Sequence, residues 1–384
     1  MREPIPIGKT YFDEDDLNSV SRPLKDGWVL QGKFVKEFED SFSKFTNAKN
    51  SIAVSSCSTA LQLVLSTFGL KDGDEVIMPS FTWIATANAV EYTGAKPVFI
   101  DIDLATFNID VNKIEEKITP RTKGIIAVHL FGLCADMDVV KNIAQKYSLF
   151  VVEDAACALG SYYKGRHCGT FGDYGCFSFH PRKSITTGEG GMITTNDNDK
   201  DALCRSLRNH GASDKKDLPF LLSDYDNLGY NFRMTDMHAA LGVSQMKKID
   251  FLLEERKRIA GLYDKYFKDI KFLKLRATEK DYVHSFQSYV CLFVPEEINK
   301  NNLEKIFAMR NNLMQKLEDA GIMTRQGTHS VSHQSYYKKK YNLIDTDCIN
   351  SLIAEKCTIA FPLFPGLNEE EISYIASRLS SIIL

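Results

Sequence analysis

The sequence predicts an α/β protein in which helices cover both faces of a mostly parallel sheet, followed by a smaller C-terminal α+β domain. Two observations predict it. From residue 51, short continuous apolar segments alternate with amphipathic helical segments, a pattern typical of buried parallel strands joined by helices. Beyond about residue 245, longer charged helices and antiparallel-looking strands follow. We therefore expect a large domain over residues 1–248, N-terminal segment included, and a small domain over residues 249–384.

The elements of the large domain follow from hydrophobic spacing and from residues that suit helix starts. Apolar residues at helical spacing predict a helix beginning near Asp13 and a second over 34–45. A third helix should open at Ser58, a suitable N-cap residue. Further helices are expected at 82–92 and 136–147, and strands at 51–55, 75–78, 96–101, 124–131, 149–153 and 192–195.

The small domain should begin with a long charged helix near residue 246. Its expected elements are helices at 246–268, 302–320 and 368–383 and strands at 288–294 and 357–361. We find no internal repeat and no low-complexity linker between the two domains.

Composition and charge exclude several classes of function. Of 384 residues, 44% are hydrophobic and 25% charged, as in ordinary globular proteins. A net charge of -3 favours neither nucleic acid nor an anionic membrane as partner. No apolar run approaches the roughly 20 residues of a membrane span, and the first ten residues lack a signal-peptide core, so a cytoplasmic location is expected. Nine cysteines without a C-x-x-C pair indicate neither a disulfide framework nor a zinc site.

Lys183 is the first candidate functional residue, and it lies in the segment 177–192. It sits between a short aromatic segment and a glycine-rich turn with glycines at 188, 190 and 191. Glycines there let the backbone approach a ligand closely or adopt φ > 0. A lysine in such a place can form a Schiff base with a carbonyl compound or with pyridoxal phosphate. The alternative is a solvated loop lysine.

Other polar and aromatic residues fall at the carboxyl ends of predicted strands, where ligands bind in α/β sheets. The turn 56–60 offers hydroxyl and N–H groups for a phosphate, or it is a plain helix cap. Trp83 can stack on a flat ring or belong to the core. Asp154 can pair with a protonated pyridine nitrogen or cap the next segment. Ser178 precedes Lys183 by five residues and can add a phosphate contact.

In their order and spacing, these segments resemble the DegT/StrS family of pyridoxal-phosphate aminotransferases, a branch of the aspartate aminotransferase fold (fold type I). The resemblance covers nearly the whole chain. It includes Gly27-Trp28, residues 79–83, Glu153-Asp154-Ala155-Ala156, residues 177–180, Lys183, residues 187–191 and residues 229–236.

The resemblance implies roles for individual residues. Lys183 would form the Schiff base with pyridoxal 5'-phosphate and move the proton during the reaction. Asp154 would pair with the pyridine nitrogen, and Trp83 would stack on the ring. Asn231 would reach across a homodimer interface to the partner's cofactor; the alternative for 229–236 is a turn before a helix capped at Thr235 or Asp236. The cofactor phosphate would be held by Ser58, Thr59 and Ser178.

Two departures from the family pattern concern the cofactor ring and the substrate. Where the family usually has Gln or His beside the ring oxygen, this chain has Cys157, and a thiol is a poor hydrogen-bond partner. The usual sugar-side pattern of the small domain is replaced by a segment with three basic or ring-nitrogen side chains that can bind a phosphate or carboxylate, or form an ordinary polar loop. The candidate substrate-binding residues are His180, Arg325, His329 and His333.

Lysine at position 183 favours transamination, because relatives that dehydrate sugars have histidine there. The resemblance implies transfer of an amino group from an amino acid, expected to be L-glutamate, to a keto-sugar. We expect a nucleotide-linked sugar used for polysaccharide or a secondary metabolite. A small phosphorylated ketone such as a triose phosphate is an alternative acceptor, and a non-catalytic sensor of the same fold is an alternative function.

Overall fold

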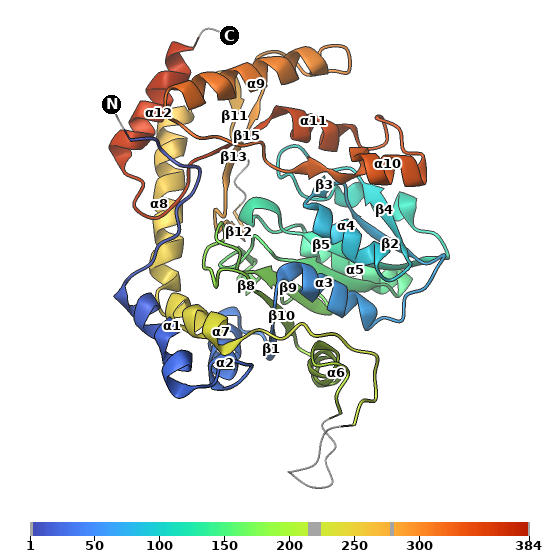
Figure 1. Ribbon diagram of the computed structural model, residues 1–384. Helices are drawn as coiled ribbons and strands as arrows, with labels where there is room; N and C mark the ends of the chain where they lie inside the picture. The colour runs from blue at the N-terminus through green and yellow to red at the C-terminus, as the bar shows by residue number, and fades with distance from the viewer. Residues whose placement is uncertain (1–2, 214–223, 277–279, 383–384) are drawn as a thin grey trace.

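A seven-stranded sheet forms the centre of the computed structural model, which describes residues 3–213, 224–276 and 280–382 (Figure 1). The strand order is β1-β10-β9-β6-β5-β2-β4. From β4 to β9 all neighbours are parallel, whereas β10 is antiparallel to both β9 and β1. The strands are β1 (Asn50–Val54), β2 (Glu75–Pro79), β4 (Lys96–Ile100), β5 (Thr122–Val128), β6 (Phe150–Asp154), β9 (Tyr174–Ser178) and β10 (Gly191–Thr195). The predicted mostly parallel sheet is confirmed.

Helices cover both faces of this sheet, because successive strand residues point to opposite sides. In β5, Ile125 and Ala127 pack toward one helix layer and Ile126 toward the other. The first layer consists of α2 (Lys33–Thr46), α5 (Met137–Tyr147) and α7 (Asp236–Lys247), with α1 (Glu14–Asp26) packed on α7. The second layer consists of α3 (Cys57–Ser66), α4 (Ile84–Glu91) and α6 (Asn198–Arg208).

The reversed direction of β10 determines which loops meet at one edge of the sheet. Its first residue, Gly191, lies opposite both Val54 at the end of β1 and Ser178 at the end of β9. Asp154, at the end of β6, lies opposite Cys176 of β9. The ends of β1, β6 and β9 and the start of β10 therefore lie together at one edge of the sheet.

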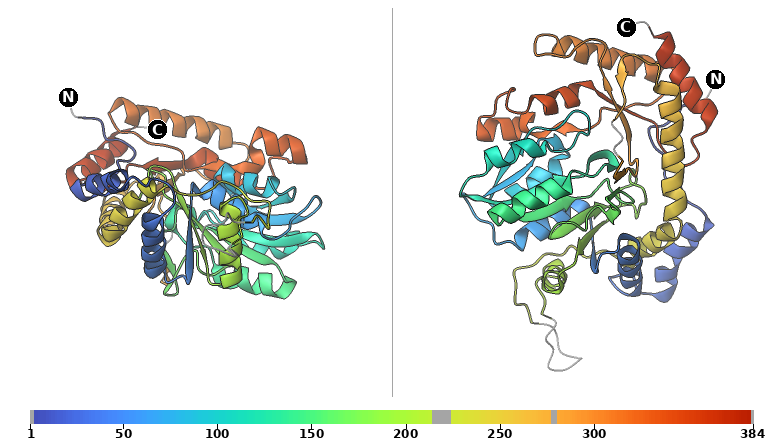
Figure 2. Two further views of the ribbon diagram at one scale, coloured as in Figure 1. Left: turned by 60° about the horizontal axis from the view of Figure 1, so that its bottom comes forward. Right: turned by 180° about the vertical axis from the view of Figure 1, so that it is seen from behind.

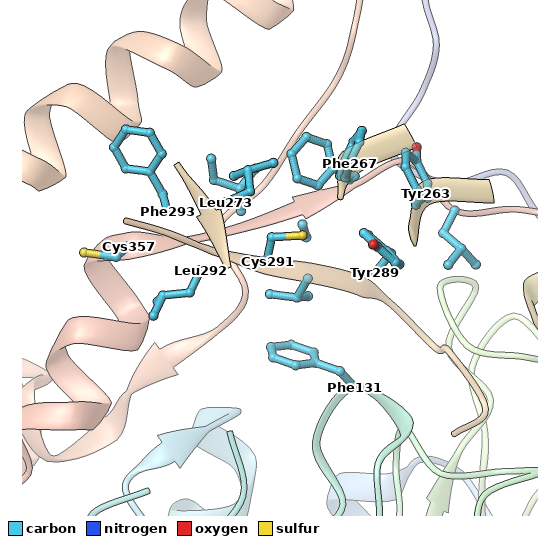
Figure 3. Close-up of a cluster of buried hydrophobic side chains, with 14 of the residues drawn as sticks. Phe131, Tyr263, Phe267, Leu273, Tyr289, Cys291, Leu292, Phe293 and Cys357 are labelled. Atoms are coloured by element: carbon cyan, nitrogen blue, oxygen red, sulfur yellow. The ribbon is translucent and has the colours of Figure 1, made fainter. Parts of the chain in front are cut away.

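Beyond residue 248 the chain forms a second sheet, whose hydrophobic cluster also includes side chains from the N-terminal part. Its strands are β11 (Leu273–Lys274), β13 (Tyr289–Phe293) and β15 (Thr358–Phe361), and its helices are α8 (Ile249–Phe267), α9 (Leu303–Asp319), α11 (Ile349–Cys357) and α12 (Glu369–Ser381). Tyr263 of α8 stacks on Tyr289 with ring centroids 4.7 Å apart. Phe131 enters the same cluster from the large-domain side (Figure 3).

Helices α7 and α8 meet at Lys248, and α8 then runs as a long helix to the far end of the molecule (Figures 1 and 2). The division into domains at 248/249 stays a prediction. Two segments pack across the boundary. Ile5 forms a parallel bridge with Ile322. In α10 (Ser335–Tyr341), the Tyr337 hydroxyl donates to Asn88 at 2.7 Å. A segment from each side of residue 248 therefore packs against the part of the molecule formed by the other side.

Three predicted helix boundaries differ from those of the structure. The N-cap of α3 is Ser56, not Ser58, because the side chains of Ser56 and Thr59 each accept the other's backbone N–H. Helix α4 begins at Ile84, since β3 (Phe81–Thr82) pairs with β14 (His329–Ser330). The helix expected over 246–268 is α8, which begins at Ile249 because residues 246 and 247 are the last turn of α7.

Short elements complete the described chain. A small sheet contains β12 (Tyr282–Val283), β7 (Tyr162–Tyr163) and β8 (Arg166–His167), and 3-10 turns lie at Val111–Lys113, Glu115–Lys117, Leu130–Gly132 and Val331–His333. Within the described ranges, we find no helix with the length and apolar character needed to cross a bilayer.

Candidate active site

The segment 179–190, which connects β9 to β10, carries Lys183. The amide of Phe179 donates to the Gly190 carbonyl at 2.9 Å, so the two ends of the segment lie together like those of a hairpin. Gly188 has φ +84, a conformation that residues with a Cβ rarely adopt. Lys183 is half-buried, and its Nζ lies 3.1 Å from Cys157 Sγ. The fold of this glycine-containing segment thus places the amine of Lys183 beside the residues that follow Asp154.

Side chains from other parts of the chain hold the backbone of this lysine segment. Arg256 of α8 donates to the Lys183 carbonyl at 3.0 Å and to the Gln287 carbonyl at 3.1 Å. The side chain of Gln287 donates to the Arg182 carbonyl at 2.9 Å. Burial lowers the pKa of Arg256 to about 10. Sequence reasoning missed Arg256, because an arginine within a charged helix carries no signal of burial.

The carboxylate of Asp154 is oriented by a threonine. Asp154 is 5% exposed, and its Oδ2 accepts the hydroxyl of Thr86 at 2.7 Å. The amide of Ala156 donates to Oδ1 at 3.2 Å. Thr86 lies on α4, fully buried, and sequence reasoning missed it because its spacing from Asp154 is set only by the fold.

The neighbouring carboxylate, Glu153, points away from Asp154, because consecutive strand residues face opposite sides. It accepts the ring N–H of His129 at 2.8 Å and three amides of residues 169–172 at 2.6 to 2.7 Å. Burial alone would raise the pKa of Glu153, but these donors outweigh it and hold that pKa below its usual value. Glu153 therefore organises the interior behind the site, and Asp154 faces the site.

The first turn of α3 lies against β10. A Cβ on Gly191 would lie 2.5 Å from the Ser56 carbonyl oxygen and 2.7 Å from the Cys57 nitrogen. The amide and hydroxyl of Thr59 are both engaged with Ser56, at 3.1 Å and 3.0 Å. The first N–H groups of a helix have no partner within the helix, so the Ser58 amide is oriented toward an external acceptor. Ser178 lies on the other side of Gly191.

Electrostatic coupling connects this turn to the lysine and the aspartate. Burial raises the pKa of the Cys57 thiol well above its usual value; the Asp154 carboxylate raises it further, and Lys183 acts in the opposite direction. These three groups therefore lie close together. Sequence reasoning did not single out Cys57, which is one of several half-buried or buried cysteines.

Trp83 and His329 lie side by side, although they are far apart in the sequence, because His329 pairs with Thr82 in the β14–β3 ladder. Trp83 is the N-cap residue of α4 and is 55% exposed. Its ring centroid lies 5.7 Å from that of His329. The pairing of β14 with β3 thus brings the predicted small-domain segment to the rim of the site.

The remaining substrate candidates differ in their surroundings. Arg325 is exposed, and its backbone pairs with Ala360. His180 is half-buried, and burial lowers its pKa. His333 is held inside the structure: its Nδ1 contacts the hydroxyls of Ser330 at 2.7 Å and Ser332 at 3.1 Å. This geometry does not favour a substrate role for His333.

Asn231 lies in an exposed segment that crosses the end of β1. The amide of Ser55 donates to the Phe232 carbonyl at 2.9 Å, and Asn231 bridges to Asn209. Helix α7 then begins after Thr235, whose side chain accepts the amide of His238 at 3.3 Å. Of the two residues that the alternative interpretation of 229–236 offered as caps, Thr235 is the N-cap. The exposed side chain of Asn231 makes its role across an interface a prediction that a single chain does not test.

Comparison with known proteins identifies the family. Residues 10–380 match the DegT/DnrJ/EryC1/StrS aminotransferase family. The chain is 36% identical to the GDP-perosamine synthase of Caulobacter vibrioides over 384 residues, covering 99% of this chain and 98% of that protein. It is 34% identical to the spore coat polysaccharide biosynthesis protein SpsC of Bacillus subtilis over 384 residues, covering 99% and 97%.

A solved structure agrees with the sequence relatives. The PLP form of the putative sugar aminotransferase Spr1654 from Streptococcus pneumoniae superimposes with a TM-score of 0.90 at 29% identity, covering 98% of this chain and 97% of that chain. A PMP form of the same protein fits equally well, with a TM-score of 0.90. The fold and the site define a fold-type I aminotransferase that uses pyridoxal phosphate. The chain belongs to the DegT/DnrJ/EryC1/StrS aminotransferase family.

Proposed function

We propose that this aminotransferase moves an amino group from L-glutamate to a nucleotide-linked keto-sugar, with Lys183 as the catalytic residue. The observation that carries the proposal is the meeting of the Lys183 amine with the segment that follows Asp154, at 3.1 Å from Cys157. The relatives support the sugar as acceptor, because one is a GDP-perosamine synthase and another serves spore coat polysaccharide biosynthesis. Use of the product in a polysaccharide or secondary metabolite, and a cytoplasmic location, stay predictions.

The residues at the edge of the sheet fit pyridoxal phosphate. A buried carboxylate, Asp154, suits a protonated pyridine nitrogen. The N-terminus of α3 suits a phosphate, and Gly191 leaves that turn uncovered by a side chain. We assign the phosphate to Ser58 and Ser178, with Thr59 acting through its place in the helix cap. Trp83 supplies an exposed aromatic face, and Cys157 lies beside the amine of Lys183.

The reaction needs a group that moves protons at carbon. When bound, pyridoxal phosphate withdraws electrons from the carbon that bears the amino group. Lys183 Nζ takes the proton from the α-carbon of the donor, and in the second half of the reaction it delivers a proton to the acceptor carbon that becomes the amine carbon. Asp154, oriented by Thr86, would stabilise positive charge at the pyridine nitrogen of a bound cofactor. Arg256 holds the carbonyl of Lys183 during these transfers.

Arg325 and His329 are the residues that we assign to the acceptor. Arg325 is exposed, and His329 lies against Trp83 at the rim of the site. His180 is adjacent to the lysine segment and completes this set. A phosphorylated triose would need a compact anion site, and the expected contribution of His333 to it is disfavoured, because the His333 ring already contacts Ser330 and Ser332. A nucleotide sugar, which extends over the exposed rim, fits the arrangement better.

A homodimer with shared sites is part of the proposal. The N-terminal segment exposes large apolar side chains, a feature typical of interaction surfaces. They are Leu17, 64% exposed, Leu24, 57%, Trp28, 57%, and Leu30, 59%. Asp236 anchors this segment, since its carboxylate accepts the amide of Gly32 at 2.8 Å. The anchored apolar surface and the exposed Asn231 support a site completed by a second copy.

A half-reaction tests the function directly. Purified protein loaded with pyridoxal phosphate is mixed with excess L-glutamate, and the visible absorption of the bound cofactor is followed. We expect conversion to the pyridoxamine form, and then its reversal by a nucleotide keto-sugar from a panel that also contains small phosphorylated ketones. Reversal by a triose phosphate alone would replace the proposed acceptor. Absence of any spectral change with amino donors would contradict the proposal.

The variant Lys183→Ala tests the assigned residue. We expect loss of turnover to background, because no other amine takes the proton from the donor carbon. Lys146→Ala is the matched control, since the Lys146 side chain is 59% exposed and forms its ion pair with Glu115 at the surface. Steady-state kinetics of both variants gives the answer: retained turnover in Lys183→Ala would remove this lysine from the mechanism.

A further inference from the structure

An amine and a thiol are in contact at the edge of the central sheet. Lys183 Nζ donates to Cys157 Sγ at 3.1 Å, although 26 positions of the chain separate the two residues. Both residues are half-buried, so a small solute has access to them. The proposed transamination uses the amine of Lys183 and assigns no reaction to the sulfur of Cys157.

The backbone is anchored on both sides of this contact. Arg256 donates to the Lys183 carbonyl at 3.0 Å, and the hydroxyl of Ser285 donates to the Cys157 carbonyl at 3.2 Å. Arg256 and Ser285 are themselves buried. Because both carbonyls are held, a closer approach of nitrogen to sulfur requires movement of the flexible lysine side chain only.

Exposure and surroundings distinguish Cys157 from the other cysteines. All nine lie within the described ranges, and seven are buried, whereas Cys57 and Cys157 are half-buried. Oxidants react with accessible thiols that can lose their proton. Burial and the Asp154 carboxylate raise the pKa of Cys57, which therefore stays a protonated thiol. Cys157 instead contacts an amine, which in its neutral form takes the thiol proton as the sulfur reacts.

We propose that Lys183 and Cys157 are a modification site at which hydrogen peroxide forms a reversible sulfur–nitrogen bond. The sulfur attacks peroxide, the O–O bond breaks, and the thiol proton leaves with the displaced hydroxide as water. The amine then attacks the sulfur of the sulfenic acid, and a second water leaves; condensation of a sulfenic acid with a nitrogen is established cysteine chemistry. In sum, one thiol, one amine and one peroxide give one S–N bond and two waters, with sulfur oxidised and peroxide reduced by two electrons.

The bond removes the amine on which the proposed transamination depends. Two thiols of a reductant reverse it: they return the sulfur to the thiol and the nitrogen to the amine, and they become a disulfide. An amine already joined to pyridoxal phosphate has no lone pair to offer the sulfur, so the cofactor should protect the site. This protection rests on the proposed function, whereas the S–N bond rests only on the contact between the two side chains.

Mass spectrometry of the full-length chain tests the proposal. The protein is treated with hydrogen peroxide, with and without pyridoxal phosphate, then digested without reductant. Without cofactor we expect the peptides of Lys183 and Cys157 to be joined and lighter by two hydrogen atoms than their sum, and dithiothreitol should separate them. The joined species should be lost in Cys157→Ser and in Lys183→Arg. The control, Cys57→Ser, alters the other half-buried thiol and should retain it.

Dimedone, which labels sulfenic acids, shows whether the amine traps the oxidised sulfur. We expect labelling of Cys157 in Lys183→Arg and Lys183→Ala and its loss in the native chain, because the native amine consumes the sulfenic acid. Equal labelling of Cys157 in native protein and in both lysine variants would overturn the proposal. A Cys57–Cys157 disulfide as the main product, or no oxidation of Cys157 in the native chain, would also overturn it. A joined species that forms equally with and without cofactor would contradict the protection and leave the S–N bond supported.

Discussion

At the scale of single residues, two adjacent carboxylates have different surroundings because they lie on opposite sides of one strand. Glu153 receives its donors from the loop 169–172 and from His129, all within the interior. Asp154 receives the Thr86 hydroxyl and faces the site. The sequence predicted a carboxylate at the end of the strand. Because successive side chains of a strand point to opposite faces, only one of Glu153 and Asp154 can face the proposed cofactor site.

Thr86 is therefore expected to affect cofactor affinity without contacting the substrate. The change Thr86→Val keeps the shape of the side chain but removes the hydroxyl that donates to Asp154 Oδ2 at 2.7 Å. A hydrogen bond to a charged group contributes about 1.5–3 kcal/mol, so we expect the dissociation constant of pyridoxal phosphate to rise at least about 10-fold. Equilibrium titration of the apoprotein measures it.

Thr93→Val is the control for this prediction. Thr93 lies in the turn that follows α4, and its hydroxyl donates to a backbone carbonyl, that of Val90, at 2.7 Å. Its removal should leave the cofactor affinity unchanged. Equal affinity in Thr86→Val and in the native protein would show that the orientation of Asp154 does not depend on this threonine.

At the scale of elements, the connection from β9 to β10 brings the lysine segment and the α3 turn together. Because the segment 179–190 forms a hairpin connection, β10 is antiparallel to its neighbours β9 and β1. The first residue of β10, Gly191, therefore lies beside the first turn of α3. That contact permits only glycine at position 191, since a Cβ would meet the Ser56 carbonyl at 2.5 Å. The packing of one strand end against one helix start thus determines the shape of the proposed phosphate site.

Gly191→Ala should separate these two elements. Crowding in a tightly packed place costs about 1–3 kcal/mol, so we expect a lower free energy of unfolding together with a loss of cofactor affinity. Urea unfolding and cofactor titration measure the two effects. Gly261→Ala, on α8, is the matched control: nothing lies within 4 Å of the added Cβ, and alanine within a helix should stabilise the protein by about 0.5–1 kcal/mol. Similar behaviour of the two variants would argue against the proposed contact.

Patterns that depend on neighbours in sequence were predicted well. Most strands of the large sheet, the helix that begins near Asp13 and the alternative of a helix capped at Thr235 follow from local spacing and side-chain chemistry. Long-range pairings were not predicted, because nothing in β3 indicates its partner β14, and nothing in α8 indicates that Arg256 reaches Lys183. Among the site candidates, the meeting of Lys183 with the Asp154 region follows from strand-end geometry, whereas the position of His333 depends on the bonds it makes to Ser330 and Ser332.

At the scale of the whole molecule, the two sides of the predicted domain boundary share the site. The lysine segment belongs to the large domain, but Arg256 and Gln287, beyond residue 248, hold its backbone. Residues of β14 likewise reach Trp83 through the pairing with β3. Relative movement of the two units would therefore change the surroundings of Lys183, which connects the packing of α8 to the chemistry at the sheet edge.

The proposed sharing of sites between two copies predicts complementation. If Asn231 acts on the partner's cofactor, a hybrid dimer of one Lys183→Ala chain and one Asn231→Ala chain contains one site with both residues native. That site takes Lys183 from the second chain and Asn231 from the first. Its activity should therefore exceed the activity of both parent homodimers, of which the first lacks the catalytic amine and the second retains cofactor weakly.

Two affinity tags allow the hybrid to be purified and assayed beside its parents at saturating and limiting cofactor. The advantage of the hybrid should be greatest at limiting cofactor, because Asn231 is expected to act on cofactor retention. A hybrid of Lys183→Ala with a native chain is the control and defines the activity of one complete site. If Asn231 served only its own chain, the hybrid would keep one weakened site and would not exceed the Asn231→Ala homodimer, since the remaining lysine would then lie beside the altered residue.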